Sequence, residues 1–240
     1  MVELSILISS YNRLPLIRRT LWSIATYCPK VPFEVVICDD GSTEDVLGEL
    51  KKYSSMFVWK FVRFEREKFE QQTGLKKLWN NPAVTNNIAF KHSSGRIIAQ
   101  MGNEMMVTKG AFNLIHNNIP LDQNYFVFST TYDVPSQYLE LLDQFGSNLS
   151  PTFEHACKRW PLQSIHYRSD VTNYLSITPR SMWEEIGGYD ERYYAGIAAE
   201  DSDFVRRGRA AGAKTVISEA ISLHQSHRGK TMYYDPPPDV

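Results

Sequence analysis

Two short apolar runs, separated by one amphipathic segment, constrain the fold of this chain more than any other feature. Residues 4–9 (LSILIS) and 33–38 (FEVVIC) are rich in β-branched residues and bounded by polar residues, which is typical of buried strands. Between them, apolar residues recur at the spacing of one helix face: Leu14, Ile17, Leu21 and Ile24. The pattern predicts a β-α-β unit, whose crossover is almost always right-handed and joins parallel strands.

A polar segment follows each of these two strands. These segments are residues 9–13 (SSYNR) and 39–42 (DDGS). They leave the sheet at the same edge, because the strands are expected to be parallel. Ligands of open α/β sheets bind at the carboxyl ends of the strands. The sequence therefore predicts a binding site that includes these two segments.

The rest of the chain continues the same alternation and then becomes irregular. In the first part we expect a helix that begins at Ser42 or Thr43, a strand at 56–64, a loop with helical pieces at 65–81, a helix between Pro82 and Gly95, and a strand at 96–101. In the second part we expect strands at 125–134, 172–179, 214–219 and 220–226, helices at 180–188 and 198–212, and a mixed insertion at 136–170. These elements favour an α/β fold with a mostly parallel sheet.

Length and charge narrow the class of protein. A chain of 240 residues can bury a substantial core, and we favour one large domain over two small ones. Lys and Arg number 26 against 27 Asp and Glu, a formal charge of −1, so no global attraction for nucleic acid is predicted.

Cysteine usage and hydropathy bear on the compartment. Cys28, Cys38 and Cys157 are too few and too scattered for a disulfide framework or a cysteine-based zinc site, which favours a reducing compartment. No basic leader with a long apolar region and no run of about 18 apolar residues is visible. We expect a soluble, cytoplasmic protein without a transmembrane segment. Peripheral contact with a membrane is the alternative.

Four blocks, in order, carry a resemblance to a known family. SILISSYNR, FEVVICDDGS, NNIAFKHSSGRII and IGGYDERYYAGIAAEDSDFVRR together resemble family 2 glycosyltransferases of the GT-A fold. The resemblance implies a single GT-A domain over residues 1–240, with a nucleotide-sugar-binding half at 1–110, an acceptor-binding half at 111–230 and a tail at 231–240. It also implies inverting transfer of a sugar from a nucleoside diphosphate, usually with a divalent metal.

The resemblance assigns a nucleotide pocket. Asp39 aligns with the carboxylate that accepts a hydrogen bond from the base, a role suited to the N–H donor of uracil. Ser9, Tyr11 and Arg13 are expected in the same pocket, and Asn87 is expected to approach the nucleotide. Asp40 and Ser42 would fix the turn. The alternative is that DDGS is only a turn and a helix cap.

The metal-binding motif of the family is altered in this sequence. Its Asp-x-Asp, which binds ribose and metal, is replaced by Gly102, Asn103 and Glu104. The resemblance implies that Glu104 keeps a carboxylate for Mn²⁺ or Mg²⁺ and that His224 completes the site. His227, Arg228 and Lys230 would contact the diphosphate. The alternatives are a solvent-facing glutamate and a structural histidine.

The block AAEDSDF supplies the catalytic candidates. Inverting transfer needs a base that takes the proton of the acceptor hydroxyl, and Asp201 aligns with that base, while Glu200 is expected to orient the acceptor or the base. The alternative is that both are only favourable charges at a helix N-terminus. Trp160, Trp183 and Tyr189 could stack on a sugar of the acceptor, although such aromatics are commonly core residues.

The sequence as a whole favours an inverting, metal-assisted glycosyltransferase of polysaccharide biosynthesis. The donor would be a UDP-sugar, with dTDP and GDP donors as alternatives, and the acceptor a hydroxyl of a glycan or lipid-linked glycan. Two rival functions stay open. A sugar nucleotidyltransferase would need a Gly-rich basic loop after the first strand, which SSYNRLP lacks. A non-catalytic nucleotide- or glycan-binding module is suggested by the altered Asp-x-Asp.

Overall fold

Four parallel strands form the first half of one sheet. The computed structural model describes residues 2–77, 81–117, 124–134, 138–140, 163–164, 175–196 and 198–225. The parallel strands lie in the order β3-β2-β1-β4, with these bounds: β1 Leu4–Ser10, β2 Phe33–Asp39, β3 Val58–Arg63 and β4 Ile97–Met101. Helix α1 (Leu14–Thr26) makes the first crossover. The predicted β-α-β unit is confirmed.

The second half of the sheet mixes strand directions. Strand β8 (Leu175–Pro179) is antiparallel to β4 and to β6 (Tyr125–Val134), and β9 (Lys214–Gln225) is parallel to β6. The short strand β5 (Met105–Val107) pairs antiparallel with β9, and β7 (Gln163–Ser164) pairs with β6. The expected mostly parallel α/β sheet is confirmed.

The two strands expected at 214–219 and 220–226 are one continuous strand, β9. The pairing of β6 with β9 shifts register between Phe128 and Thr130. At this point β9 has an irregularity of the bulge type, and the chain does not turn back. Such a bulge bends a strand and absorbs extra residues without ending it. The polar residues in the middle of the segment therefore mark a bulge, not a chain reversal.

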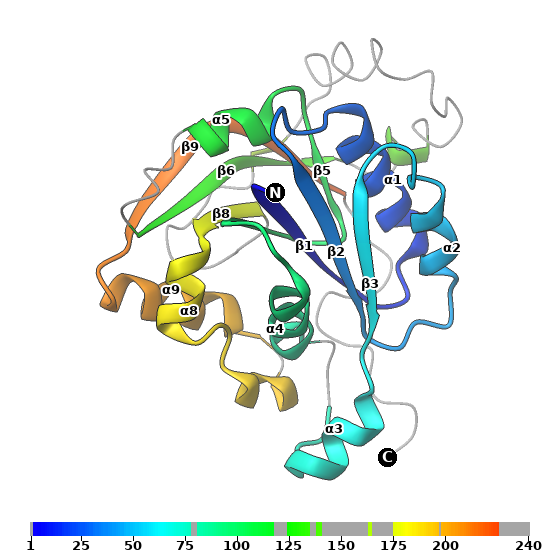
Figure 1. The fold of residues 1–240 in the computed structure, drawn as a ribbon, viewed down its shortest axis with the longest axis vertical. Coiled ribbons are helices and arrows are strands. Elements are labelled where there is room, and N and C mark those ends of the chain that lie inside the picture. The colour runs from blue at the N-terminus through cyan, green and yellow to red at the C-terminus, as the bar shows by residue number, and fades with distance from the viewer. Residues whose placement is uncertain are drawn as a thin grey trace.

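Helices cover both faces of the sheet (Figure 1). Leu4, Ile6 and Ile8 of β1 pack in one apolar cluster with α1, α2 (Val46–Lys51) and α5 (Ala111–Asn117). Leu7 points to the opposite face, as successive strand residues must. There it joins a second cluster, which is built on three further helices: α4 (Ala83–His92), α8 (Arg180–Ile186) and α9 (Glu200–Ala210).

Two helix boundaries differ from the sequence expectation. Helix α2 is capped by Asp45, whose Oδ1 accepts a hydrogen bond from the Gly48 N–H at 2.8 Å, and not by Ser42 or Thr43. Helix α4 ends at His92, before Gly95. Ser42 instead donates a hydrogen bond to Asp39, and Gly95 packs against β1, so neither residue stands at the helix boundary that the sequence pattern gave it.

The segment expected as a loop with helical pieces contains a defined helix, α3 (Arg66–Thr73), which projects below the sheet in Figure 1. None of its residues is buried, so its sequence lacks the apolar residues at helical spacing that mark a helix packed on a core. It ends at Gly74, whose φ of 72° is the left-handed conformation common after a helix.

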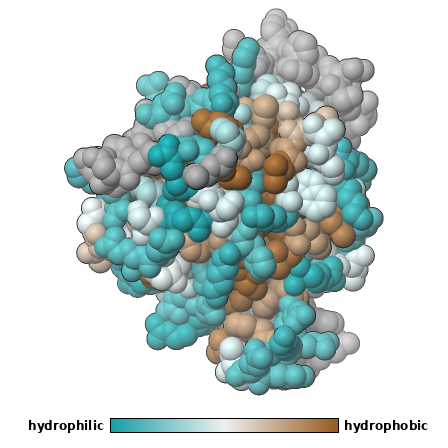
Figure 2. Space-filling view, viewed as in Figure 1, coloured by the Kyte–Doolittle hydropathy of each residue, from teal (hydrophilic) through white to brown (hydrophobic). Residues whose placement is uncertain are grey.

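Polar residues cover much of the visible surface, and apolar residues gather over the centre of this view (Figure 2). Among the described residues the large apolar side chains that stay exposed are Met56, Val58, Ile217 and Ile221. Within the same part of the chain, no helix is both long and apolar enough to span a bilayer.

Gly95 has no room for a side chain. A Cβ there would lie 2.6 Å from the Ser5 amide nitrogen and 2.8 Å from the Leu4 carbonyl carbon, both backbone atoms of the central strand β1. We predict that Gly95→Ala lowers the free energy of unfolding by about 1–3 kcal/mol, the usual effect of overpacking. Urea denaturation measures this change.

The control for this prediction is Lys91→Ala on the neighbouring helix α4, where the side chain is exposed. Its effect should stay within about 0.5 kcal/mol, as for most surface substitutions. Equal stabilities of the two variants would contradict the close packing of the α4–β4 connection against β1.

Candidate active site

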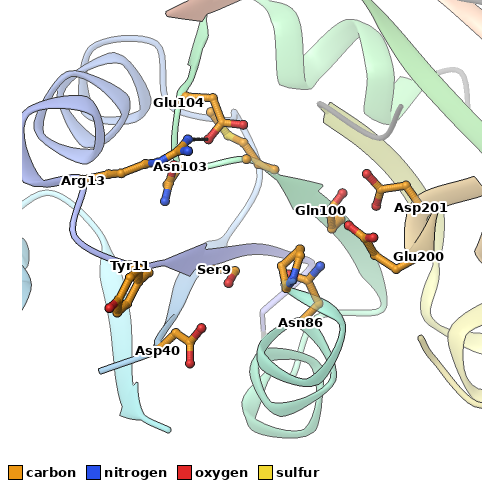
Figure 3. Close-up of a pocket in the computed structure, with 13 residues that line it drawn as sticks. Ser9, Tyr11, Arg13, Asp40, Asn86, Gln100, Asn103, Glu104, Glu200 and Asp201 are labelled. Atoms are coloured by element: carbon orange, nitrogen blue, oxygen red, sulfur yellow. Dashed lines mark ion pairs between the residues drawn. The ribbon is translucent and has the colours of Figure 1, made fainter. Parts of the chain in front are cut away.

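A cavity of about 250 Å³ opens at the carboxyl edge of β1 and β4 (Figure 3). The sequence placed eight of its lining residues in the site: Ser9, Tyr11, Arg13, Gly102, Asn103, Glu104, Glu200 and Asp201. The structure adds five more: Asp40, Pro82, Asn86, Gln100 and Met101. The cavity therefore joins the ends of two parallel strands to the N-terminal ends of α4 and α9.

The two aspartates at the carboxyl end of β2 exchange their expected positions. Asp39 is fully buried and does not line the cavity. Its carboxylate accepts a hydrogen bond from the Ser42 N–H at 3.0 Å and lies 2.7 Å from Arg63 Nη1, so it fixes the turn. Asp40 lines the cavity instead, because consecutive residues at a strand end point to opposite sides. The structure therefore brings Asp40, and not the expected Asp39, to the cavity.

Cations already surround Asp40. Its Oδ1 lies 3.2 Å from Arg66 Nη2, and its Oδ2 contacts the Lys77 ammonium. Burial lowers the pKa of Lys77, although the ion pair with Asp40 opposes this effect. The Arg66 guanidinium also lies 5.1 Å from the centre of the Tyr11 ring. This side of the cavity thus presents the Tyr11 ring beside the Asp40 carboxylate, whose charge is balanced by Arg66 and Lys77.

Gly102 lets Glu104 fold back over the strand end. A Cβ at position 102 would lie 2.8 Å from Glu104 Oε1, so the glutamate occupies the space of a side chain at the first position of the motif. Glu104 Oε2 lies 3.5 Å from Arg13 Nη1 (dashed in Figure 3). The Oδ1 atom of Asn103 is buried and has no hydrogen-bond partner among the described residues. Glu104 and Asn103 therefore both line this end of the cavity.

His224 does not line the cavity. It lies opposite Asp133 in the pairing of β6 with β9, and its Nδ1 is 2.9 Å from Asp133 Oδ1. His224 also lies opposite Met105 in the pairing of β5 with β9, next in sequence to Glu104, so its expected place in a metal site with Glu104 stays a prediction. No group of three or more His, Cys, Asp or Glu that could hold a metal occurs in the described part of the chain. His227, Arg228 and Lys230 lie outside the described residues.

The donor set nevertheless fits one kind of metal site. Mg²⁺ and Mn²⁺ prefer oxygen ligands and are commonly held by one or two carboxylates together with substrate phosphates. Glu104 and the unpartnered Asn103 Oδ1 are oxygens of this kind. The residues fit a metal that is shared with a bound diphosphate, and not one enclosed by the protein alone.

Two carboxylates from the start of α9 lie across the cavity from Glu104 and Arg13 (Figure 3). The preceding Ala199 has a φ of 83°, a left-handed conformation that is strained for a residue with a side chain and often occurs at functional sites. Asp201 Oδ1 accepts a hydrogen bond from the Tyr189 hydroxyl at 3.0 Å. Glu200 is 8% exposed and accepts one from Asn81 Nδ2 at 2.7 Å, and burial raises its pKa.

Three other residues that were expected to contact a ligand do not line the cavity. Trp183 is buried and donates a hydrogen bond from Nε1 to Thr178, and the Tyr189 ring stacks on Phe204 with centroids 4.3 Å apart. Asn87 Nδ2 donates to the Tyr189 carbonyl at 2.9 Å, and its Oδ1 accepts from the Tyr189 N–H at 2.8 Å.

These positions correct the expected sugar stacking by Trp183 and Tyr189 and the expected nucleotide contact of Asn87. The two aromatic rings belong to the core, and Asn87 holds the backbone of the loop from which Tyr189 reaches Asp201. Trp160, the third expected acceptor contact, lies outside the described residues.

Sequence reasoning missed Asn86 and Gln100, although one signal was available. Gln100 interrupts an otherwise apolar strand, IIAQM, at a position where a buried residue is expected. A polar residue in such a strand, one step before its carboxyl end, indicates a side chain that faces a site.

The curled, mostly parallel sheet with this cavity at its carboxyl edge defines a GT-A type of domain. Residues 5–169 match the sequence profile of "Glycosyl transferase family 2", and the chain belongs to this family. Solved structures agree in fold. S. aureus TarS 1-349 in complex with UDP-GlcNAc superposes with a TM-score of 0.64 at 18% identity, over 96% of this chain and 60% of that chain.

A second solved structure is equally similar in fold. The mannosyltransferase PcManGT from Pyrobaculum calidifontis, in complex with GDP-Man and Mn²⁺, has a TM-score of 0.64 at 15% identity and covers 95% of this chain and 58% of that chain. An uncharacterized glycosyltransferase of Rickettsia bellii is 30% identical over 168 residues, 65% of this chain and 21% of that protein. Chondroitin synthase of Pasteurella multocida is 39% identical over 62 residues, 26% of this chain and 6% of that protein. The chain thus matches a minor part of these relatives' length.

The raised pKa of Glu200 predicts a pH-dependent effect on stability. The folded state binds the Glu200 proton more tightly than the unfolded state, so the free energy of unfolding falls as pH rises from the ordinary value of 4.5 through the folded pKa. Glu200→Gln removes this loss, since glutamine stays neutral. We predict that the melting temperature of the variant, relative to the parent, increases with pH across this window.

Asp203→Asn is the control of opposite sign. Burial raises the pKa of Asp203, but hydrogen bonds from Arg207 and Arg206 outweigh it, and the net shift is downward. Asp203 therefore stabilises the fold above its ordinary pKa of 3.8 and loses this contribution as pH falls through the folded pKa. Its variant should be less stable than the parent at neutral pH. If Glu200→Gln shows the same sign and trend as Asp203→Asn, the assignment of a pKa raised by burial to Glu200 is wrong.

Proposed function

We propose that this chain carries the donor site and the catalytic base of an inverting glycosyltransferase that uses a nucleoside diphosphate sugar. The observation that carries the proposal is the single cavity in which Asp201 and Glu200 lie opposite Glu104 and Arg13 (Figure 3). Inverting transfer needs a base on one face of the sugar and a stabilised leaving group on the other. This arrangement supports both roles.

Asp201 acts as the general base in this proposal. It takes the proton of the acceptor hydroxyl while that oxygen attacks C1 of the donor sugar and the bond from C1 to the diphosphate oxygen breaks. The Tyr189 hydroxyl donates to Asp201 Oδ1 and so fixes the orientation of the carboxylate. Glu200 is held by Asn81 and lies beside the acceptor.

Glu104 and Asn103 would hold a divalent metal together with the diphosphate, which the metal would neutralise as it leaves. Charge supports this role. The cavity lining has four carboxylates, Asp40, Glu104, Glu200 and Asp201, against one guanidinium, Arg13. Arg66 and Lys77 offset Asp40. Without a cation, a diphosphate would face uncompensated negative charge.

The nucleotide base would stack on Tyr11 with Asp40 at its edge, Asp40 taking the role that the sequence gave to Asp39. Ser9 and Gly102 line the cavity between the base side and the diphosphate side and would approach the ribose. UDP remains the favoured nucleotide. The UDP-GlcNAc and GDP-Man complexes of the two similar structures support a nucleotide-sugar donor in general. The acceptor would be a hydroxyl of a glycan or lipid-linked glycan.

The rival functions are less well supported. A nucleotidyltransferase needs backbone amides and basic residues to cradle a triphosphate, but only Tyr11, Asn12 and Arg13 join β1 to α1, without a glycine. A non-catalytic binding module needs no carboxylate pair opposite the donor site. Binding of a nucleotide sugar without transfer or hydrolysis would favour the module.

Asp201→Asn tests the base. The substitution keeps size and hydrogen bonding and removes the basic oxygen, so we predict that turnover falls by about 10²–10⁴ while donor affinity is nearly unchanged. Glu200→Gln should reduce turnover less. Release of nucleoside diphosphate in the presence of Mn²⁺ and acceptor glycans measures turnover, and calorimetry measures affinity. A dead Glu200→Gln variant beside an active Asp201→Asn variant would reverse the two roles.

Glu104→Ala tests the metal. We predict that Mn²⁺ strengthens UDP binding to the parent protein at least tenfold and that Glu104→Ala abolishes this gain, since the variant lacks the one carboxylate at that end. Isothermal titration with and without Mn²⁺ measures it. Glu184→Ala, which removes an exposed carboxylate of α8, is the control and should keep the full gain. A gain that survives in Glu104→Ala would place the metal elsewhere.

A further inference from the structure

Two neutral amide side chains that line the cavity have buried polar atoms without hydrogen-bond partners in the described part of the chain. Both Oδ1 and Nδ2 of Asn86 and the Oε1 of Gln100 are buried and unpaired among the described residues. Asn86 is fully buried, and Gln100 is 6% exposed. Buried polar groups of a native protein are nearly always paired, so unpaired ones that line a cavity indicate a missing ligand.

The two amides come from elements that share one face of the sheet. Ile98 packs in the apolar cluster on the α4 side, and Gln100, two residues further along β4, points to the same face. Asn86 comes from α4 itself, one turn after Pro82, which also lines the cavity. In Figure 3 both lie on the side of Glu200 and Asp201, away from Arg13 and Asn103.

This position lies between the proposed base and the proposed diphosphate site, where the transferred sugar must sit. An amide both donates and accepts hydrogen bonds, which matches sugar hydroxyls, whereas phosphate oxygens only accept. The nearest charged residues of the lining, Glu200 and Asp201, would repel a carboxylate on the sugar. Arg13, the only cation of the described lining, lies at the opposite end.

We infer that Asn86 and Gln100 form the subsite for the transferred glycosyl unit and select an uncharged sugar by hydrogen bonds to its hydroxyls. The inference rests on the proposed function and adds to it the chemical class of the donor sugar. Neither residue takes part in proton transfer. Their contribution is to donor affinity and to the choice of sugar.

Asn86→Leu and Gln100→Leu test the subsite, because leucine is close in size and lacks the polar atoms. The free variants should melt at or above the temperature of the parent, since each loses an unpaired buried polar group. Calorimetry with Mn²⁺ then compares UDP-glucose with UDP, and GDP-mannose with GDP. We expect each variant to bind the nucleotide sugar about tenfold more weakly and the nucleoside diphosphate alone unchanged.

Two controls separate this result from general damage to the cavity. Met101→Leu changes an apolar lining residue next to Gln100 and should keep the ratio of the two affinities. Tyr11→Ala should weaken UDP and UDP-glucose equally, because it acts on the nucleotide. In the parent protein UDP-glucose should also bind more tightly than UDP-glucuronate.

The outcomes distinguish the inference from the proposed function. If the parent binds a nucleotide sugar but both leucine variants lose nucleotide and nucleotide sugar alike, or lose neither, the subsite is wrong and the proposed function stands. Tighter binding of UDP-glucuronate than of UDP-glucose overturns the selection of an uncharged sugar. If the parent binds none of these nucleotides or nucleotide sugars, both the proposed function and the inference fail.

Discussion

The parallel pairing of β1 with both β2 and β4 is the constraint on which the site depends. Residues 4–10 of β1 pair in register with residues 33–39 of β2, and residues 4–8 pair with residues 97–101 of β4. All three strands therefore end at one edge, and the segments that follow them meet there. Because β1 is buried on both faces, a shift of its register would misplace core side chains and the polar residues after it together.

The same pairing explains how residues from both halves of the chain come together at one cavity. Strand β8 adds to β4, and the helices that follow it in the sequence pack on the α4 face of the sheet. The stacking of Tyr189 on Phe204 in this second cluster fixes the start of α9. Packing of apolar residues thus sets the position of Asp201 relative to the strand ends, although Asp201 itself contributes nothing to the core.

Charge within the cavity is arranged by partners that do not line it. Arg63 and Ser42 hold Asp39 in the turn, while Arg66 and Lys77 offset the charge of Asp40. The side of the cavity proposed for the nucleotide base is therefore close to neutral. On the opposite side, the Glu200 carboxylate accepts a hydrogen bond from the neutral amide of Asn81. Negative charge is therefore concentrated beside the candidate base, where a neutral sugar and a hydroxyl acceptor meet least repulsion.

The sequence by itself determined the strands β1 to β4, the helices α1, α2 and α4, the family and most of the cavity lining. Short-range patterns suffice for these features, since the apolar periods identify the elements and parallel pairing brings the segments after the strands to one edge. For the same reason Ser9, Tyr11, Arg13 and Glu104 were predicted correctly as neighbours in one cavity.

Only the tertiary structure decided which face each polar residue meets. It placed Asp40 rather than Asp39 at the cavity, turned His224 to Asp133 and assigned Trp183 and Tyr189 to the core. It also showed that Asn86 and Gln100 line the cavity with buried polar atoms that have no partner among the described residues. The direction of a side chain at the end of a strand or helix depends on partners that are distant in sequence, such as Arg63 for Asp39, and no local pattern encodes them.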